Sequence, residues 1–425
     1  MPRNRLSSLL ALAAALALSA CGDSKPAPKP GGPGNAPGAP AGPTLGRKMP
    51  QYTPSGMKDD WKKVAELEAA VKGSKKIDEQ NAAKKALADY LAEFPARWEG
   101  KDVPAPEAIY YAVVLQKCKL YPQAAFQAGR YIEVAPEDSS NYVNAHTVML
   151  SSLAQSGDFD GAEAGLRKAA EGAYKNRESE RRAVEETIAN SMLKGGRVDL
   201  AAEHFRELAE VSLDFDAAKM AADCYLRLGR LDDAKRLAAK MTDLIKDGKN
   251  APFAQWLVQQ LDLIGKPAPG FAAAKWWKGV GAPIADGDLK GKVTVVFTWN
   301  MKSAWNEFFF QRVAQLTKDL ADKPFQVVGI SRLARFDAVI QATKADMTEE
   351  EELLRYDMWA QQYPVTYPLA VDSYESEALL GPWVGHTVPF FVIVGKDGKI
   401  ASVRFGKAEE HFAALKELVE KELAK

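Results

Sequence analysis

The chain has 425 residues, of which 47% are hydrophobic and 26% are charged, so it is long enough for two domains with separate cores. Its 56 lysines and arginines balance 56 aspartates and glutamates, which argues against nucleic acid as a partner because such proteins usually carry a basic excess. The three cysteines, Cys21, Cys118 and Cys224, are too few and too widely spaced for a disulfide scaffold.

The N-terminus has the pattern of a secretory signal peptide. Arg3 and Arg5 precede an apolar run, Leu9 to Leu18, that is too short to span a bilayer. The run ends in Leu18-Ser19-Ala20-Cys21, which resembles the bacterial lipoprotein signal. The resemblance implies that residues 1–20 are removed and that acyl chains such as palmitate are attached to Cys21. The alternative is an ordinary secretory signal with a chance cysteine.

The lipoprotein resemblance implies a cell-envelope location on the periplasmic side, with the membrane as a partner through the lipid anchor. Gly22 follows the lipidated cysteine, and by analogy this favours the outer over the inner membrane. Residues 21–56 are rich in proline, glycine and alanine, and they lack the apolar side chains needed to fold. We therefore predict that this segment is a tether.

Residues 57–264 show the three- and four-residue apolar spacing of helices, and they contain a weak repeat. Gly157, Gly196 and Gly229 each open one similar turn between two helical segments, and Lys119 stands where a fourth would begin, giving spacings of 38, 39 and 33 residues. The pattern resembles tetratricopeptide repeats, whose period is about 34 residues. Such arrays usually bind proteins or peptides. The alternative is an all-helical domain without repeats.

The composition changes near Gly265-Lys266-Pro267, where we place the start of a second domain, 265–425. Strands alternating with helices indicate an α/β fold, with a parallel crossover at the first strand–helix–strand unit. The expected elements are a strand Val293–Trp299, a turn Asn300–Asn306, a helix Glu307–Leu320, a strand Phe325–Ile330, charged helices within Phe336–Gln362, a strand Tyr367–Asp372, a hairpin of Phe390–Val394 and Ile400–Phe405, and a last helix Glu409–Leu423.

Two segments of this domain, Lys292–Asn306 and Gly385–Ile400, resemble the thioredoxin-like redoxins of the bacterial cell envelope. In that family a tryptophan precedes a C-x-x-C motif by four residues, and a cis-proline precedes a later strand. Alignment on Trp299 places Ser303 and Asn306 at the two cysteine positions.

The resemblance implies a thioredoxin-like fold, a cis peptide bond at Val388–Pro389, and Ser303 opening the helix beside it. Val388 also matches the position that pairs its backbone with an extended substrate in the family.

Thiol–disulfide exchange needs two sulfurs, and residues 265–425 contain no cysteine. We therefore predict a degenerate redox site with no catalytic residue and with binding as the remaining function. The partner is an unidentified envelope protein or peptide. The candidate groove residues are Trp299, Lys302, Trp305, Val388 and Pro389.

Two alternatives stay open at this point. Trp299, Trp305 and Trp383 form either an aromatic rim around the groove or part of the core. The domain is either a binding module or an oxidoreductase that uses Cys118 or Cys224, although each of these cysteines is more typical of a packed interior. No metal or other cofactor is expected, because the four histidines lack metal-ligand spacing.

Overall fold

The computed structural model describes residues 53–74, 76–137, 139–246, 250–271, 275–277, 281–303, 306–337, 342–360, 365–374, 376–406 and 409–425, with Met49 and Gln51. The predicted signal peptide, Cys21, most of the tether, and Trp305 lie outside these residues. Two compact units divide the chain between Gly195 and Gly196. None of the described helices is both long and apolar enough to cross a bilayer.

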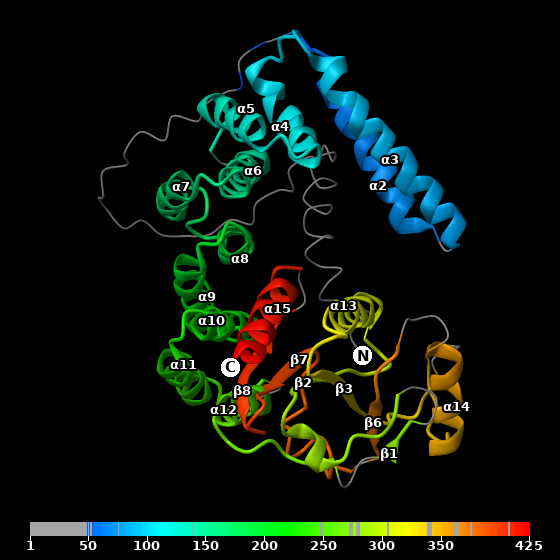
Figure 1. Cartoon of the computed structure of the whole chain (residues 1–425). Coiled ribbons are helices and arrows are strands. Elements are labelled where there is room, and N and C mark those ends of the chain that lie inside the picture. Colours follow the sequence, from blue (N-terminus) through cyan, green and yellow to red (C-terminus); the bar gives the residue numbers. More distant parts are fainter. Residues whose placement is uncertain are drawn as a thin grey trace, which may run out of the picture. The chain divides into compact units, whose positions relative to one another are not determined.

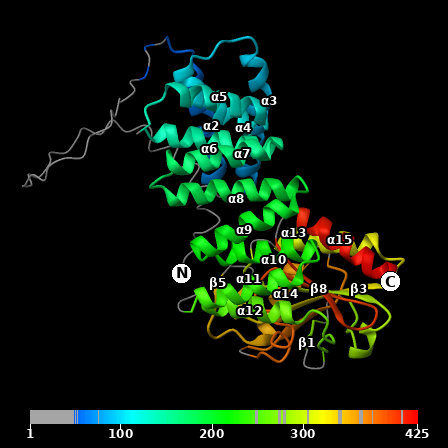
Figure 2. The same ribbon diagram turned by 90° about the vertical axis from the view of Figure 1, so that its left-hand side faces the viewer.

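In the described part of the first unit, every secondary-structure element is a helix (Figure 1). Its α-helices are α2 (Met57–Gly73), α3 (Ile77–Trp98), α4 (Ala108–Lys117), α5 (Tyr121–Val134), α6 (Ser140–Ser156), α7 (Phe159–Glu171) and α8 (Glu178–Lys194). Helices adjacent in sequence pack against each other, and α6 also contacts α8, which lies beside the α6–α7 pair (Figure 2). Apolar side chains of α2, α3 and α4 form one core cluster of this unit.

The second unit begins with four more α-helices, which are followed by a mixed sheet and its own helices. The first four are α9 (Val198–Ser212), α10 (Phe215–Arg227), α11 (Leu231–Leu244) and α12 (Ala251–Asp262). Eleven α-helices of the described chain thus precede the sheet, and helix gives way to strand near Gly265, as the composition predicted. The compact unit, however, begins at Gly196, so α9–α12 belong with the sheet.

The glycine turns of the predicted repeat are equivalent in the structure. Gly157 lies between α6 and α7, Gly196 between α8 and α9, and Gly229 between α10 and α11, with φ of 90°, 78° and 72°. Glycine suits these turns because it adopts positive φ without steric cost. Lys119, between α4 and α5, adopts the same region with φ of 61°, which confirms the fourth turn.

The sheet of the second unit has six strands in the order β1-β6-β3-β2-β7-β8. The strands are β1 (Lys275–Trp276), β2 (Val293–Thr298), β3 (Phe325–Arg332), β6 (Leu369–Asp372), β7 (Phe390–Val394) and β8 (Ile400–Phe405). Strands β2, β3 and β6 are parallel, whereas β7 runs antiparallel to β2 and β8 antiparallel to β7. The helix α13 (Asn306–Asp319) makes the crossover from β2 to β3, and α15 (Glu409–Ala424) ends the chain. This is the predicted thioredoxin-like fold.

The prediction of helices from Phe336 was wrong in its first part. Residues Phe336–Asp337 form a short strand, β4, which pairs with β5 (Ala342–Thr343), and only α14 (Glu349–Ala360) is helical. Arg335 has φ of 52°, which a right-handed helix does not allow. The buried Glu352 carboxylate accepts hydrogen bonds from the Ala334 and Arg335 amides and fixes this bend.

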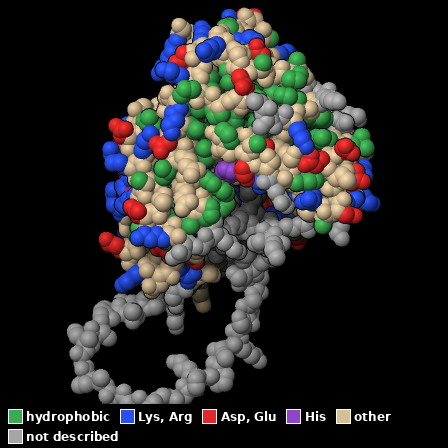
Figure 3. Space-filling view, turned by 90° about the horizontal axis from the view of Figure 1, so that it is seen from below, with side chains coloured by type: hydrophobic (Ala, Val, Ile, Leu, Met, Phe, Trp, Pro, Cys, Tyr) green, Lys and Arg blue, Asp and Glu red, His purple; other side chains and the backbone are tan. Residues whose placement is uncertain are grey.

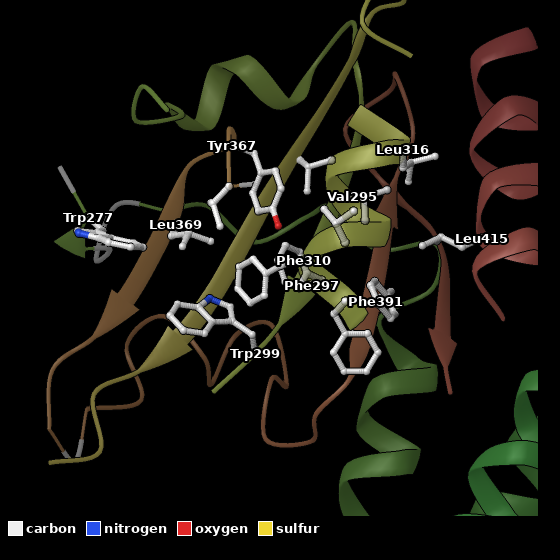
Figure 4. Packing of buried hydrophobic residues seen from close by; sticks show 14 of the residues in the cluster. Trp277, Val295, Phe297, Trp299, Phe310, Leu316, Tyr367, Leu369, Phe391 and Leu415 are labelled. Atoms are coloured by element: carbon white, nitrogen blue, oxygen red, sulfur yellow. The ribbon is translucent and has the colours of Figure 1, made fainter. Parts of the chain in front are cut away.

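The core of the second unit lies between the sheet and its helices. Alternate residues of β2 and its extension, Val293, Val295, Phe297 and Trp299, point to one face, as a strand requires. There they join aromatic and aliphatic side chains of α13, α15 and the neighbouring strands (Figure 4). All of β2 is buried, which explains its unbroken apolar sequence.

A buried carboxylate joins α10 to the sheet. Asp223 is 0% exposed, and its Oδ1 accepts a hydrogen bond of 3.1 Å from the amide of Phe405 in β8. Its Oδ2 lies 3.0 Å from Nε of Arg227 and 3.4 Å from Nδ1 of His411 in α15. Burial by itself would raise the pKa of Asp223. The hydrogen bond from His411 and the charges of Arg404, His411 and Arg227 together outweigh it and lower the pKa.

Lys119→Gly is expected to stabilise the first unit by roughly 0.5 kcal/mol. Glycine removes the steric cost of a left-handed backbone at this position, which is roughly 1–2 kcal/mol. This gain exceeds the roughly 0.4–1 kcal/mol lost because glycine raises the conformational entropy of the unfolded chain. The control is Lys168→Gly, in the last turn of α7, which should lower the stability by up to about 1 kcal/mol. Urea denaturation measures both. A loss of stability in both variants would contradict the equivalence of the Lys119 turn.

Asp223→Asn is expected to lower the free energy of unfolding by about 3–5 kcal/mol, because it leaves buried guanidinium groups without their carboxylate. Asp216→Asn, in the same helix but with 74% of its side chain exposed, should change it by less than about 1 kcal/mol.

The Asp223 carboxylate also predicts a pH dependence. Folding lowers the pKa of Asp223, so its ionised form stabilises the folded state. This contribution to the free energy of unfolding is fully present above the unfolded pKa near 4 and is lost as the pH falls below that value. The difference in stability between wild type and Asp223→Asn should therefore shrink as the pH falls below about 4. Urea midpoints at several pH values test this, and a constant difference would contradict it.

Candidate functional site

The candidate site lies at one end of the central strands. Phe297 in β2 is opposite Phe391 in β7, and these two strands run antiparallel. The chain leaving β2 and the loop entering β7 therefore meet at the same end of the sheet. The Val388–Pro389 peptide bond in that loop is cis, as predicted.

Thr298, the last residue of β2, ties this loop to the sheet. Its hydroxyl donates to the carbonyl oxygen of Thr387 at 2.6 Å and accepts from the amide of Phe390 at 3.0 Å. These two bonds lie on either side of Val388–Pro389. The Thr298 side chain is 2% exposed, so both bonds are shielded from water and loss of either would leave a buried backbone group unsatisfied.

The two positions aligned with the missing cysteines do not both lie on the helix. Ser303 itself is not helical and α13 is described from Asn306, so the predicted start of the helix at Ser303 falls next to residues 304–305, which lie outside the described part. Residues Asn300 to Ser303 form a tight turn that the Ser303 amide closes by donating to the Asn300 carbonyl at 3.1 Å. The Asn306 side chain lies outside the described part, and Lys302 is exposed with its ammonium group 5.5 Å from the Phe336 ring centroid. Ser303 is partly buried.

Two of the three candidate rim tryptophans are core residues. Trp299 is 1% exposed and contacts the rings of Phe310 and Tyr356, at centroid distances of 5.5 and 5.4 Å. Trp383 is 0% exposed and stacks on Phe271. Neither ring is therefore available to a ligand in this structure.

Neither described thiol has the properties of a reactive cysteine. Cys224 in α10 is 0% exposed, and burial, with a smaller contribution from Asp223, raises its pKa to about 12. Burial also raises the pKa of Cys118, whose thiol contacts the Leu91 carbonyl oxygen at 3.4 Å. Exchange requires a thiolate, so both thiols are poor candidates at neutral pH. No group of three or more metal-binding side chains occurs among the described residues.

The structure adds residues to the site that the sequence analysis did not select. The ring of His386, three residues before Pro389, stacks on Trp256 of α12 with a centroid distance of 4.7 Å. Its Nδ1 lies 3.5 Å from the Glu377 carboxylate, which also pairs with Arg332 at the end of β3. The sequence carried no signal for these contacts, because the four residues come from four separate segments of the chain.

The surface of the molecule carries charges of both signs. On the face shown in Figure 3, lysines and arginines alternate with acidic side chains, and hydrophobic side chains gather around a hollow near the centre. A histidine and an acidic side chain are visible beside the hollow. Neither charge dominates this face.

Comparison with known proteins shows likeness only to solved structures, since neither the family models nor the curated proteins include a match. A thiol-disulfide isomerase from Corynebacterium glutamicum is 20% identical, with 38% of this chain and 98% of that chain covered and a TM-score of 0.30. A thiol:disulfide interchange protein of the thioredoxin family from Chlorobium tepidum is 21% identical, covering 37% and 96%, with a TM-score of 0.27.

A third similar structure is the thioredoxin domain of a thiol-disulfide oxidoreductase from Bacteroides vulgatus. It is 18% identical and covers 37% of this chain and 97% of that domain, with a TM-score of 0.27. The thioredoxin-like assignment for this chain rests on its strand order and on the place of the cis-proline before β7.

Proposed function

We propose that this chain is a lipid-anchored protein of the bacterial cell envelope that binds an extended segment of a partner protein or peptide and does not catalyse thiol–disulfide exchange. Acyl chains on Cys21 hold it in the outer membrane on the periplasmic side, and residues 21–56 act as the tether. The eleven helices and the thioredoxin-like domain supply the binding surfaces.

One observation carries the proposal: the cis-proline loop expected of a thioredoxin-like site is present in a domain without cysteine. The cis Val388–Pro389 bond and both hydrogen bonds of Thr298 are present, whereas residues 265–425 contain no cysteine. A mixed disulfide cannot form on serine or asparagine. Backbone groups beside the cis-proline need no sulfur to pair with an extended chain.

The absence of catalysis is tested by turbidimetric insulin reduction, with the dithiothreitol background subtracted. We expect no reduction by the wild-type chain and measurable reduction, about tenfold above background, by Ser303→Cys/Asn306→Cys, because both sulfurs are then present. The single variant Ser303→Cys is the matched control, since it lacks a resolving thiol. Robust reduction by the wild type would overturn the proposal in favour of an oxidoreductase.

The anchor is tested by fractionation of cells that express the full chain. Wild type should sediment with membranes, and Cys21→Ser should be released to the soluble fraction, because several acyl chains on one residue give stable anchoring. Cys118→Ser is the control and should remain with the membranes. Membrane association of the Cys21→Ser variant equal to that of wild type would contradict lipid anchoring at this residue.

A further inference from the structure

The last helix before the sheet contacts the cis-proline loop directly. Gln260 of α12 is 0% exposed, and its Nε2 donates to the Val384 carbonyl at 2.9 Å and to the Thr387 hydroxyl at 3.0 Å. Both acceptors lie within the five residues that precede Pro389. A helix that the sequence assigns to the repeat region therefore holds the loop of the thioredoxin-like site.

The loop needs such support because of its backbone conformation. Val384 has φ of 50°, a left-handed value that is rare for a β-branched residue. Residues held in such conformations persist only where their surroundings determine them, and they cluster at functional sites. Gln260 binds the carbonyl of this residue, so it acts on the strained part of the loop.

The same loop is held from the sheet and from α12 at one residue. The Thr387 hydroxyl accepts a hydrogen bond from the Gln260 amide, and the Thr387 carbonyl oxygen accepts one from the Thr298 hydroxyl. One residue earlier, the His386 ring stacks on Trp256 with an interplanar angle of 24°. Positions 384, 386 and 387 are therefore each fixed by a contact with α12.

Packing alone does not explain a glutamine at this place. Methionine would fill a similar volume without burying an amide, and Oε1 of Gln260 has no hydrogen-bond partner among the described residues. The unsatisfied buried carbonyl oxygen lowers the stability of the fold, so a role for the amide in the loop explains the glutamine better than packing does. Its two bonds go to the loop and to nothing else that the structure describes.

We propose that Gln260 and Trp256 are positioning residues for the binding site. Helix α12 is then a structural part of that site, because it holds the cis-proline loop in place. This inference rests on the proposed function, because it names the part of the chain that presents the loop to an extended polypeptide. Gln260 holds the backbone at Val384 and Thr387, and Trp256 holds His386. The carbonyl and amide groups around Val388 are thereby kept in place for strand pairing.

The experiment compares wild type with Gln260→Met and Trp256→Leu in the full chain, with Gln259→Met as the matched control. Gln259 is an exposed residue of the same helix. Hydrogen exchange followed by mass spectrometry reports on residues 380–390, and urea midpoints report on the fold. Fluorescence anisotropy measures binding of reduced, carboxymethylated and fluorescein-labelled α-lactalbumin, an unfolded polypeptide without free thiols.

We expect faster exchange of residues 380–390 and about tenfold weaker binding in both α12 variants, with neither change in the control. Trp256 is only partly buried, so Trp256→Leu keeps the test valid if Gln260→Met lowers the urea midpoint. Unchanged exchange of the loop in both variants would overturn the inference. Faster exchange with unchanged binding would also overturn it, because the loop would then not serve the site. A wild type that does not bind the polypeptide would refute the proposed function, while exchange still decides whether α12 positions the loop.

Discussion

The arrangement of the second unit depends on one buried carboxylate. The Asp223 carboxylate accepts a hydrogen bond from the Phe405 amide in β8. Because β8 is the outer strand of the sheet, this amide would otherwise have no strand to pair with. An uncompensated charge at this depth would be too costly, and Arg227 and His411 supply the compensation. The cluster thereby joins α10 to β8 and α15, two neighbouring elements that follow α10 by more than 170 residues.

This attachment has a consequence for the site. Helices α10, α11 and α12 pack in sequence, so fixing α10 to β8 also limits where α12 can lie. From that position α12 reaches the loop before β7 through Gln260 and Trp256. The boundary between helical repeat and thioredoxin-like domain is therefore clear in secondary structure but not in packing.

The fold does not need the cysteines whose chemistry it usually carries. Its stability comes from the rings and aliphatic side chains between the sheet and α13, including Phe297, Phe310 and Tyr367, and from the threonine bonds around the cis-proline. The turn Asn300–Ser303 that follows β2 is closed by its own backbone bond. The absence of a cysteine pair and the presence of the cis-proline loop are thus physically independent.

Local patterns in the sequence determined the five longer strands and the repeat turns, and the resemblance to the redoxins indicated the place of the cis-proline. A buried strand needs an unbroken apolar run, and a left-handed turn favours glycine, so both can be recognised within a few residues. The sequence could not show that Phe336 begins a strand, because a distant carboxylate, Glu352, bends the chain there. Nor could it show the contacts of Gln260, His386 and Asp223. Those depend on long-range packing, which brings together segments more than one hundred residues apart and leaves no local periodicity to read.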